Sequence, residues 1–397
     1  MKNFFSELWA GIVGFFMNFG THLACIGLTF VVTAAILIPT FNHQNDKLDT
    51  LEDLINYRFV ENPDISAMHD AAAEAMVNAM GDRWSYYMTA EEFESYQKSM
   101  KSEYVGIGVT IQTQEDESGF CVVKVAENGP ADQAGIHIGD IIVGADEQYV
   151  AQVGLDTVSG LIAGEKGTVV QIHLLRGDES MTVSVTRDTV LMQTASGAML
   201  EDKIGLVTIF GFESRSASDT IAVIKDLQQQ GAEKLIFDVR NNPGGYASEM
   251  VSLLDYLLPE GAVFRTESSF GNTSVEESDA ACLEMPMAVL VNAQSYSAAE
   301  LFAAALQEYE WATVVGQQTF GKGYYQSTFE LGDGSAVTLS IGKYYTPKGK
   351  SLIGVGVTPD IVKEVDDETA ALIYANQLDP MEDPQILAAI DALKSGN

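Results

Sequence analysis

Apolar residues are most continuous near the amino terminus. Residues 8–41 contain no Asp, Glu, Lys or Arg, and residues 23–41 form the best unbroken apolar run. This run is close to the roughly 20 residues that a helix needs to cross a bilayer. A cleaved signal peptide fits less well, because its apolar region is normally about 7–15 residues and no clear A-x-A site follows. We therefore expect residues 1–44 to form a short cytoplasmic stub and a transmembrane anchor, with the soluble part outside the cytoplasm.

Helical spacing then extends over residues 45–103. From Leu48 onward leucines recur every third residue, as on one face of a helix. Thr89 and Glu92 have the spacing of a capping box, which predicts that another helix begins there. A linker and a dimerisation arm are both consistent with this segment. Together with the helical, acidic segment 366–397, it is the candidate surface for a homodimer.

Between these helical segments the pattern changes twice. Residues 104–187 contain short β-type runs bounded by Gly, Pro and Asp, which predicts a small, mostly β domain. Residues 188–365 alternate strand-like and helical runs, which predicts an α/β core with crossover helices. The expected fold is therefore a multidomain α+β protein: a membrane helix, a helical arm, a β domain, an α/β core and a helical tail.

Charge and cysteine content exclude several classes of protein. The chain of 397 residues has a formal net charge of −34, so it offers no surface for a nucleic-acid backbone or for anionic lipid headgroups. Its three cysteines, Cys25, Cys121 and Cys282, are far apart, which excludes a disulfide framework and a cysteine zinc site. We expect no metal and no cofactor.

The distribution of histidine limits the chemistry of the α/β core. The last of the five histidines is His173, so residues 188–365 contain none. A Ser-His-Asp triad cannot be built within that domain. A general base there would have to be Lys, Asp, Glu, Tyr or Cys.

Two loops of the core carry candidate oxyanion and nucleophile groups. Residues 238–245 end in Asn-Pro-Gly-Gly after an apolar strand, and the N–H groups of such a glycine turn can face a ligand. In residues 295–306, serines stand where a strand turns into an alanine-rich helix, whose free N–H groups favour developing negative charge. Plain N-capping is the commoner role for such a serine, and Ser297 with Glu300 also fits a capping box.

A third loop carries a candidate base. Lys322 lies between Gly321 and Gly323, and a desolvated lysine loses its proton more easily than a hydrated one. Gln326 lies four residues further on. It would share a face with Lys322 in a strand and could orient the amine. An exposed turn lysine is the simpler interpretation of this loop alone. With no histidine in the domain, however, a serine–lysine pair is the remaining serine-nucleophile chemistry.

Taken together, these motifs resemble those of the C-terminal processing peptidases, PDZ-containing serine peptidases with a Ser–Lys dyad. The resemblance covers about residues 50–365. The motifs that carry it are Gly106-Ile-Gly108, Pro130–Asp140, Asp238–Gly245, Ser297-Ala-Ala-Glu300, Phe320-Gly-Lys-Gly323, Tyr345–Ser351 and Gly356–Asp360.

The resemblance implies a role for each matching residue. It implies that Ser297, rather than Ser295, is the nucleophile, that Lys322 is the general base and that Gln326 orients the lysine. The N–H of Ala298 and that of either Gly244 or Gly245 would form the oxyanion hole. The fold it implies is a PDZ domain over residues 104–187 and a peptidase core with ββα-type units over residues 188–365.

The PDZ resemblance implies that Gly106, Ile107 and Gly108 hold the carboxylate of a peptide added as a strand. Two positions depart from the family pattern. Ala163 stands where many relatives carry Arg, so an arginine-based coupling between PDZ domain and active site is in doubt. Tyr296 stands where a small residue is usual, next to the expected nucleophile.

We therefore expect a membrane-anchored, extracytoplasmic serine endopeptidase that captures protein or peptide substrates by their free C-termini. A catalytically silent PDZ scaffold on a peptidase-like core is the main alternative, although it predicts the loss of Ser297 or Lys322, and both are present. A hydratase or isomerase of similar core fold offers no role for Lys322 or for an attached PDZ domain.

Overall fold

The computed structural model describes residues 47–395 except 115, 127 and 376. The expected transmembrane run, residues 23–41, lies outside these residues. In the part of the chain that is described, no helix is long and apolar enough to cross a membrane. The chain divides into two compact units, one ending at Ala75 and the other beginning at Met76.

In its described residues, the segment expected to be a helical arm contains three helices and one strand, before β2 begins at its last residue. These elements are α2 (Leu48–Arg58), α3 (Ile65–Asn78), β1 (Tyr86–Met88) and α4 (Ala90–Met100). The capping box at the start of α4 is confirmed: Thr89 Oγ1 accepts from Glu92 N, and Glu92 Oε2 accepts from Thr89 N. The expectation of a purely helical segment is wrong at β1, which pairs with β18 of the peptidase region.

The small β domain is an antiparallel sheet in the order β3-β4-β5-β7-β8, with β6 beside β5. Its strands are β3 (Val109–Thr113), β4 (Phe120–Val125), β5 (Ile141–Ala145), β6 (Gln148–Tyr149), β7 (Val169–Arg176) and β8 (Glu179–Thr186). Its helices are α5 (Pro130–Gln133), α6 (Val150–Val153) and α7 (Leu155–Ile162). Alternate residues of these strands form its own hydrophobic core, as the sequence predicts. The strands β2 (Glu103–Gly106) and β9 (Asp188–Leu191), which pair with each other, lead into and out of the domain.

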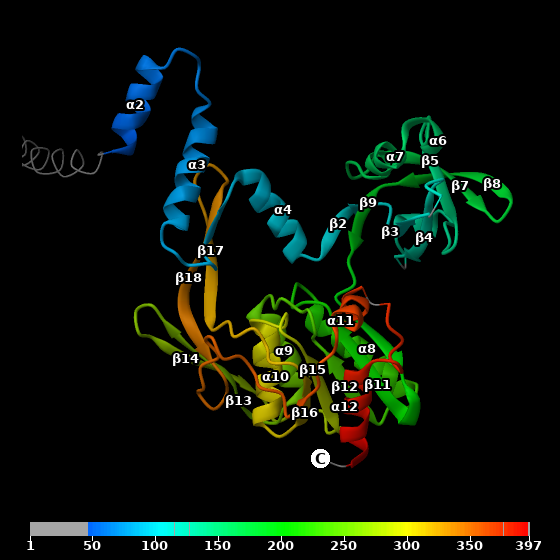
Figure 1. The fold of residues 1–397 in the computed structure, drawn as a ribbon, viewed down its shortest axis with the longest axis vertical. Coiled ribbons are helices and arrows are strands. Elements are labelled where there is room, and N and C mark those ends of the chain that lie inside the picture. Colours follow the sequence, from blue (N-terminus) through cyan, green and yellow to red (C-terminus); the bar gives the residue numbers. More distant parts are fainter. Residues whose placement is uncertain (1–46, 115, 127, 376, 396–397) are drawn as a thin grey trace, which may run out of the picture. The chain divides into compact units, whose positions relative to one another are not determined.

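The core of the second half is a six-stranded sheet in the order β10-β11-β12-β15-β16-β19 (Figure 1). All of its strands run parallel except β10. They are β10 (Ala195–Met199), β11 (Ile204–Ile209), β12 (Lys234–Asp238), β15 (Met287–Val291), β16 (Ala312–Gly316) and β19 (Ile361–Val362), with a 3₁₀ turn η1 (Glu201–Lys203) after β10.

Helices bury both faces of this sheet, which explains why its strands are almost continuously apolar. One face packs against α8 (Ser216–Gln229), α9 (Ala247–Leu257) and α10 (Ala298–Glu308). The other packs against α12 (Pro384–Ser395), which follows α11 (Asp367–Tyr374). The carboxyl ends of β12 and β15 lead into the two loops singled out from the sequence, and parallel strands bring such ends to one edge.

A second, antiparallel sheet lies outside the predicted strand–helix alternation. It has the order β1-β18-β13-β14, with β17 also paired to β18. Its remaining strands are β13 (Gly261–Ser268), β14 (Thr273–Ser278), β17 (Tyr324–Glu330) and β18 (Ala336–Tyr345). Lys322 lies just before β17, so this sheet sets the position of the lysine loop.

Candidate active site

The two serines at the start of α10 have different surroundings. Ser295 is fully buried, and its hydroxyl donates to Val239 O at 2.7 Å while accepting from Asn292 N at 3.0 Å. Ser297 is the N-cap of α10, with φ 61° and ψ −121°, a conformation that non-glycine residues rarely adopt. Ser297 lines a cavity, whereas Ser295 ties the turn to the end of β12.

Glu300 joins the serine turn to the lysine loop. Its side chain is completely buried, and its carboxylate accepts four hydrogen bonds, from Ser297 N (3.0 Å), Thr319 Oγ1 (2.6 Å), Gly321 N (2.7 Å) and Lys322 N (2.9 Å). Burial raises the pKa of Glu300, and these hydrogen bonds act in the opposite direction. The sequence suggested only a capping box here. The three contacts to the lysine loop come from residues that are distant in sequence.

The glycine loop approaches the serine turn so closely that side chains are excluded. A Cβ on Gly244 would lie 2.8 Å from Ser297 Cβ and 2.9 Å from Ala298 N, and Gly244 has φ +91°. A Cβ on Gly245 would lie 2.5 Å from Phe212 O. The N–H of Gly244 donates to Asn242 Oδ1 at 2.8 Å. Of the two glycines expected as oxyanion donors, Gly245 is therefore the better candidate.

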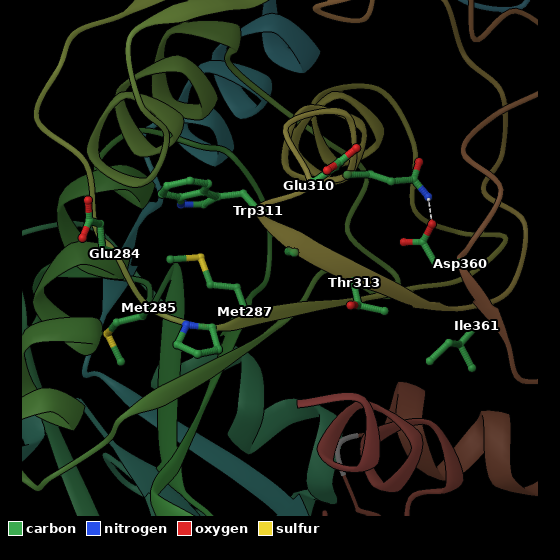
Figure 2. A pocket seen from close by; sticks show the side chains of 11 residues that line it. Glu284, Met285, Met287, Glu310, Trp311, Thr313, Asp360 and Ile361 are labelled. Carbon is green, nitrogen blue, oxygen red and sulfur yellow. Dashed lines mark hydrogen bonds between the residues drawn. The ribbon is translucent and has the colours of Figure 1, made fainter. Parts of the chain in front are cut away.

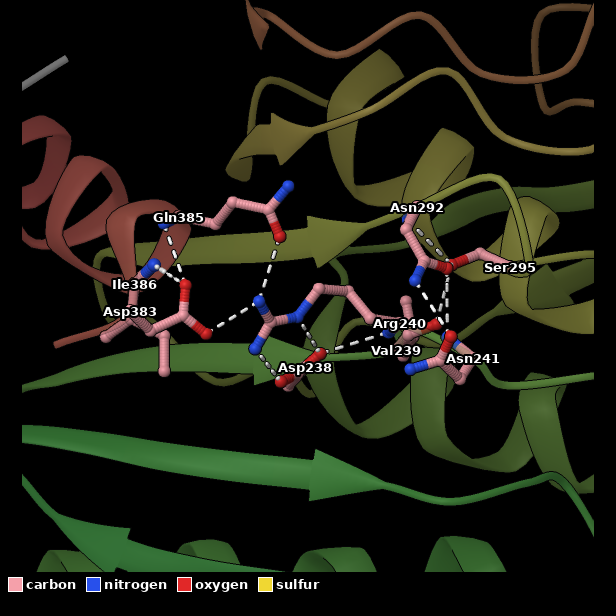
Figure 3. Close-up of polar contacts among 9 residues, drawn as sticks. All are labelled: Asp238, Val239, Arg240, Asn241, Asn292, Ser295, Asp383, Gln385 and Ile386. Carbon is pink, nitrogen blue, oxygen red and sulfur yellow. Dashed lines mark hydrogen bonds and ion pairs between the residues drawn. The ribbon is translucent and has the colours of Figure 1, made fainter. Parts of the chain in front are cut away.

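A buried arginine, Arg240, links the start of the glycine loop to the tail helix (Figure 3). Arg240 donates from Nε and one terminal nitrogen to both carboxylate oxygens of Asp238, at 2.9 and 2.6 Å. Its other terminal nitrogen donates to Asp383 Oδ2 (2.7 Å) and Gln385 Oε1 (2.8 Å) at the start of α12. All four side chains are buried. The tail helix is therefore part of the support of the site, a role that the sequence did not indicate.

Lys322 faces an aromatic side chain from the segment before β1. Its Nζ lies 4.5 Å from the centroid of the Trp84 ring. Burial lowers the pKa of Lys322 to about 8, while the carboxylates of Glu300 and Asp82 act to raise it. The hydroxyl of Tyr344 donates to Lys322 O at 2.7 Å and fixes the loop. Trp84 was not among the residues predicted from sequence, because nothing local marks it.

One cavity of about 640 Å³ collects most of the predicted peptidase residues. Ser297, Ala298, Gly245, Lys322 and Gln326 all line it. The rest of its wall is largely apolar and includes Phe93, Tyr96, Met250, Phe264, Leu301 and Tyr325. The site can therefore accept an apolar side chain next to a serine hydroxyl and a desolvated lysine.

Gln326 lies in β17, whereas Lys322 precedes the strand. The amide nitrogen of Gln326 donates to Tyr324 O (3.0 Å) and Ser340 Oγ (3.1 Å). These two bonds hold Gln326 in the wall of the cavity, and neither is to the lysine.

The predicted peptide-binding residues begin the β domain. Gly106 ends β2, and Gly108 has φ +83°. The side chain of Ile107 is buried in the core of the domain, so only its backbone is available to a ligand. Arg187 lies against Gly164, the residue after Ala163. Its guanidinium donates to Leu161 O, Ile162 O (3.1 Å) and Thr168 Oγ1 (2.7 Å).

A second hollow of about 740 Å³ lies at the amino-terminal ends of β15 and β16 (Figure 2). The side chains that line it include the apolar Met285, Met287 and Trp311 and the acidic Glu284, Glu310 and Asp360. The predicted catalytic residues lie at the other ends of the strands. Among the described residues, no three His, Cys, Asp or Glu side chains are grouped so that they could hold a metal ion.

Comparison with known proteins defines the class of this arrangement. The family model of the PDZ domain matches residues 105–186, and that of peptidase family S41 matches residues 203–363. The crystal structure of a Bacteroides fragilis protein described as a "Putative S41 protease" matches over 85% of this chain and 93% of its own, with a TM-score of 0.52 and 16% identity. That likeness concerns the fold alone. The chain thus carries a PDZ domain and an S41 peptidase domain.

Curated relatives narrow the class further. "Carboxy-terminal processing protease CtpA" of Bacillus subtilis is 29% identical over 362 residues, which is 89% of this chain and 77% of the relative. "Probable CtpA-like serine protease" of Staphylococcus epidermidis is 29% identical over 354 residues, 85% of this chain and 71% of the relative. The resemblance stated from the sequence is confirmed: the chain carries a PDZ domain and a peptidase S41 domain, and over most of its length it is similar to C-terminal processing serine proteases.

Proposed function

We propose that the chain is an endopeptidase that cleaves peptide bonds with a Ser297–Lys322 dyad. The observation that carries this proposal is the shared cavity, in which Ser297 lies in a strained N-cap conformation and the pKa of Lys322 is lowered to about 8. A neutral amine is required of a lysine base, and burial supplies it near neutral pH.

The proposed reaction gives each of these groups a role. Neutral Lys322 takes the proton of Ser297 Oγ as the oxygen attacks the peptide carbonyl carbon. The N–H groups of Ala298 and Gly245 stabilise the resulting oxyanion. The lysine then gives its proton to the leaving amine, which leaves an acyl-enzyme on Ser297. Water attacks this ester as Lys322 takes its proton, and the proton passes to Ser297 Oγ as the acid product leaves. Gln326 orients the amine by turning its amide from Tyr324 O and Ser340 Oγ toward Lys322.

Single substitutions test the dyad. Ser297→Ala and Lys322→Ala should each abolish cleavage of a peptide, because the loss of either member disables residues that act as a unit. Neither substitution should change the unfolding transition. Gln326→Ala should retain partial activity. Lys348→Ala is the matched control, since Lys348 is an exposed lysine of the same domain. Cleavage at the wild-type rate by Ser297→Ala would refute the assignment, and a wild-type protein that binds peptides without cutting them would favour the silent scaffold.

The PDZ domain is proposed to bind substrate C-termini at Gly106–Gly108, and residues 23–41 to anchor the chain with its soluble part outside the cytoplasm. A free-acid peptide should then be cleaved with a higher kcat/KM than its amide. The full chain should remain in the membrane fraction after a carbonate wash, whereas residues 45–397 alone should not. The homodimer proposed for residues 45–103 and 366–397 is tested by light scattering of the soluble form, and a monomer would refute it.

A further inference from the structure

Three aromatic rings form a cluster, and one of them, Trp84, faces Lys322. Trp84 packs against Tyr296 with a centroid distance of 6.1 Å, and its ring meets Phe320 edge-on at 5.6 Å. Tyr296 and Phe320 are themselves 5.6 Å apart. One ring therefore neighbours the nucleophile in sequence and another lies two residues before the lysine. The third, Trp84, comes from a segment more than 200 positions earlier in the chain.

Trp84 is held in place by its neighbours. Its backbone N–H donates to Asp82 Oδ1 (3.2 Å), and Ser85 Oγ donates to Asp82 Oδ2 (2.6 Å). The hydroxyl of Ser85 also accepts from Ser340 N (3.0 Å) in β18. Directly after Ser85, β1 pairs with β18, and Tyr86 lies opposite Thr338. The indole is thus fixed to the sheet that carries the lysine loop.

A ring in this position acts on an amine in two opposite ways. Its π face attracts the ammonium form, by about 0.5–2 kcal/mol. Its apolar bulk excludes water and so favours the neutral form. The charged groups that face Lys322 do not explain a neutral amine, because the carboxylates of Glu300 and Asp82 both favour the ammonium. The guanidinium of Arg83 lies over the Trp84 and Phe320 rings, 4.8 and 4.9 Å from their centroids.

We propose that Trp84 is a positioning residue of the peptidase reaction: its ring closes the lysine loop to water and keeps the amine of Lys322 in the neutral form that can accept a proton. Water exclusion thus outweighs the attraction of the π face. This role of Trp84 depends on one part of the proposed function, namely that Lys322 is the general base.

The test is a titration of Lys322 itself, which needs no activity. Reductive ¹³C-methylation and NMR follow the lysine signals against pH, with Lys322→Ala to assign the signal. Trp84→Ala should move the midpoint of Lys322 to higher pH. In parallel, kcat/KM at pH 7 should fall by about tenfold for each pH unit of that move, and the loss should vanish at high pH. Trp84→Leu keeps an apolar wall without a π face and should hold the midpoint near or below that of the wild type. Trp311→Phe, at the second hollow, is the control and should change neither quantity.

The outcomes separate the two proposals. An unchanged or lower midpoint in Trp84→Ala would overturn the role of Trp84, since it would mean that the ring retains the ammonium or has no influence. If Trp84→Ala does not fold, Trp84→Leu decides, because a midpoint close to the normal value for lysine would equally refute water exclusion. A shifted midpoint together with full cleavage by Ser297→Ala would leave the role of Trp84 intact and refute the dyad.

Discussion

Replacing Glu300 by Gln tests how the serine turn and the lysine loop are held together. The substitution preserves shape and volume but turns one oxygen into an NH₂ group. In the structure the two carboxylate oxygens receive four donors, three of which are backbone N–H groups that cannot act as acceptors. Each oxygen receives two of these donors, so the new NH₂ group faces donors in either orientation of the amide.

The smaller penalty arises when NH₂ replaces Oε1. The hydroxyl of Thr319 can then rotate and accept a hydrogen bond, but Gly321 N is left unpaired in a buried site. One such group costs about 1–3 kcal/mol in the free energy of unfolding. In the other orientation the N–H groups of Ser297 and Lys322 both lose their acceptor, and the cost is about 2–6 kcal/mol. The amide will adopt the less costly orientation, so we expect the free energy of unfolding to fall by about 1–3 kcal/mol.

Two assays measure the result. Urea unfolding should show a lower midpoint, and kcat should fall by up to about 100-fold, because small displacements of reacting groups have effects of that size. Glu310→Gln is the matched control, since Glu310 is exposed just beyond the end of the same helix. If Glu300→Gln has the midpoint and kcat of the wild type, the carboxylate does not fix the two loops and the reasoning is wrong.

Four further predictions follow from the site. Because only neutral Lys322 can act as base, kcat/KM should rise with pH through about 8, and a flat profile from acid to alkaline pH would contradict this. Gly244→Ala should reduce kcat by about 100-fold in a stopped-flow assay, because its Cβ would lie 2.8 Å from Ser297 Cβ; a near-normal kcat would show that this close contact does not affect the nucleophile. Asp383→Ala leaves Arg240 with Asp238 as its ion-pair partner and removes one of the two acceptors on its other side, where Gln385 remains; it should cost about 1–3 kcal/mol in the free energy of unfolding, measured by chemical denaturation, and no loss of stability would show that this pair is not needed. Gly108→Val, at φ +83°, should weaken binding of free-acid peptides in a fluorescence anisotropy titration, whereas equal affinity would remove this loop from the peptide site.

Much of the fold could be predicted because its signals are local. Strand-like runs such as Met287–Val291 and the capping box at Thr89 depend on neighbouring residues alone, and the structure has both. The antiparallel sheet was missed because the pairings that unite it, β13 with β18 and β1 with β18, join segments far apart in the chain.

The same limit applies to the site. Ser297 and Lys322 stand in short motifs that can be recognised in isolation, whereas Trp84 and Asp383 have no local pattern. Trp84 reaches the site only when β1 pairs with β18, and Asp383 reaches Arg240 only when α12 packs on the sheet. The choice between Gly244 and Gly245 likewise depends on a hydrogen bond to Asn242 that the sequence does not reveal.

The support of the glycine loop by the tail helix also sets an order in time. Arg240 and Asp383 are 143 positions apart, and a chain is synthesised from its amino terminus. At about 5–20 residues per second, Asp383 is added roughly 7–30 seconds after Arg240. During that interval the nascent chain can already contain the serine, the lysine and both glycines, while one side of the arginine lacks its partners. A chain that has not yet reached Asp383 is therefore unable to fix this loop from both sides of the arginine, and the loop beside the nucleophile turn is completed only when the segment from Asp383 to Gln385 docks.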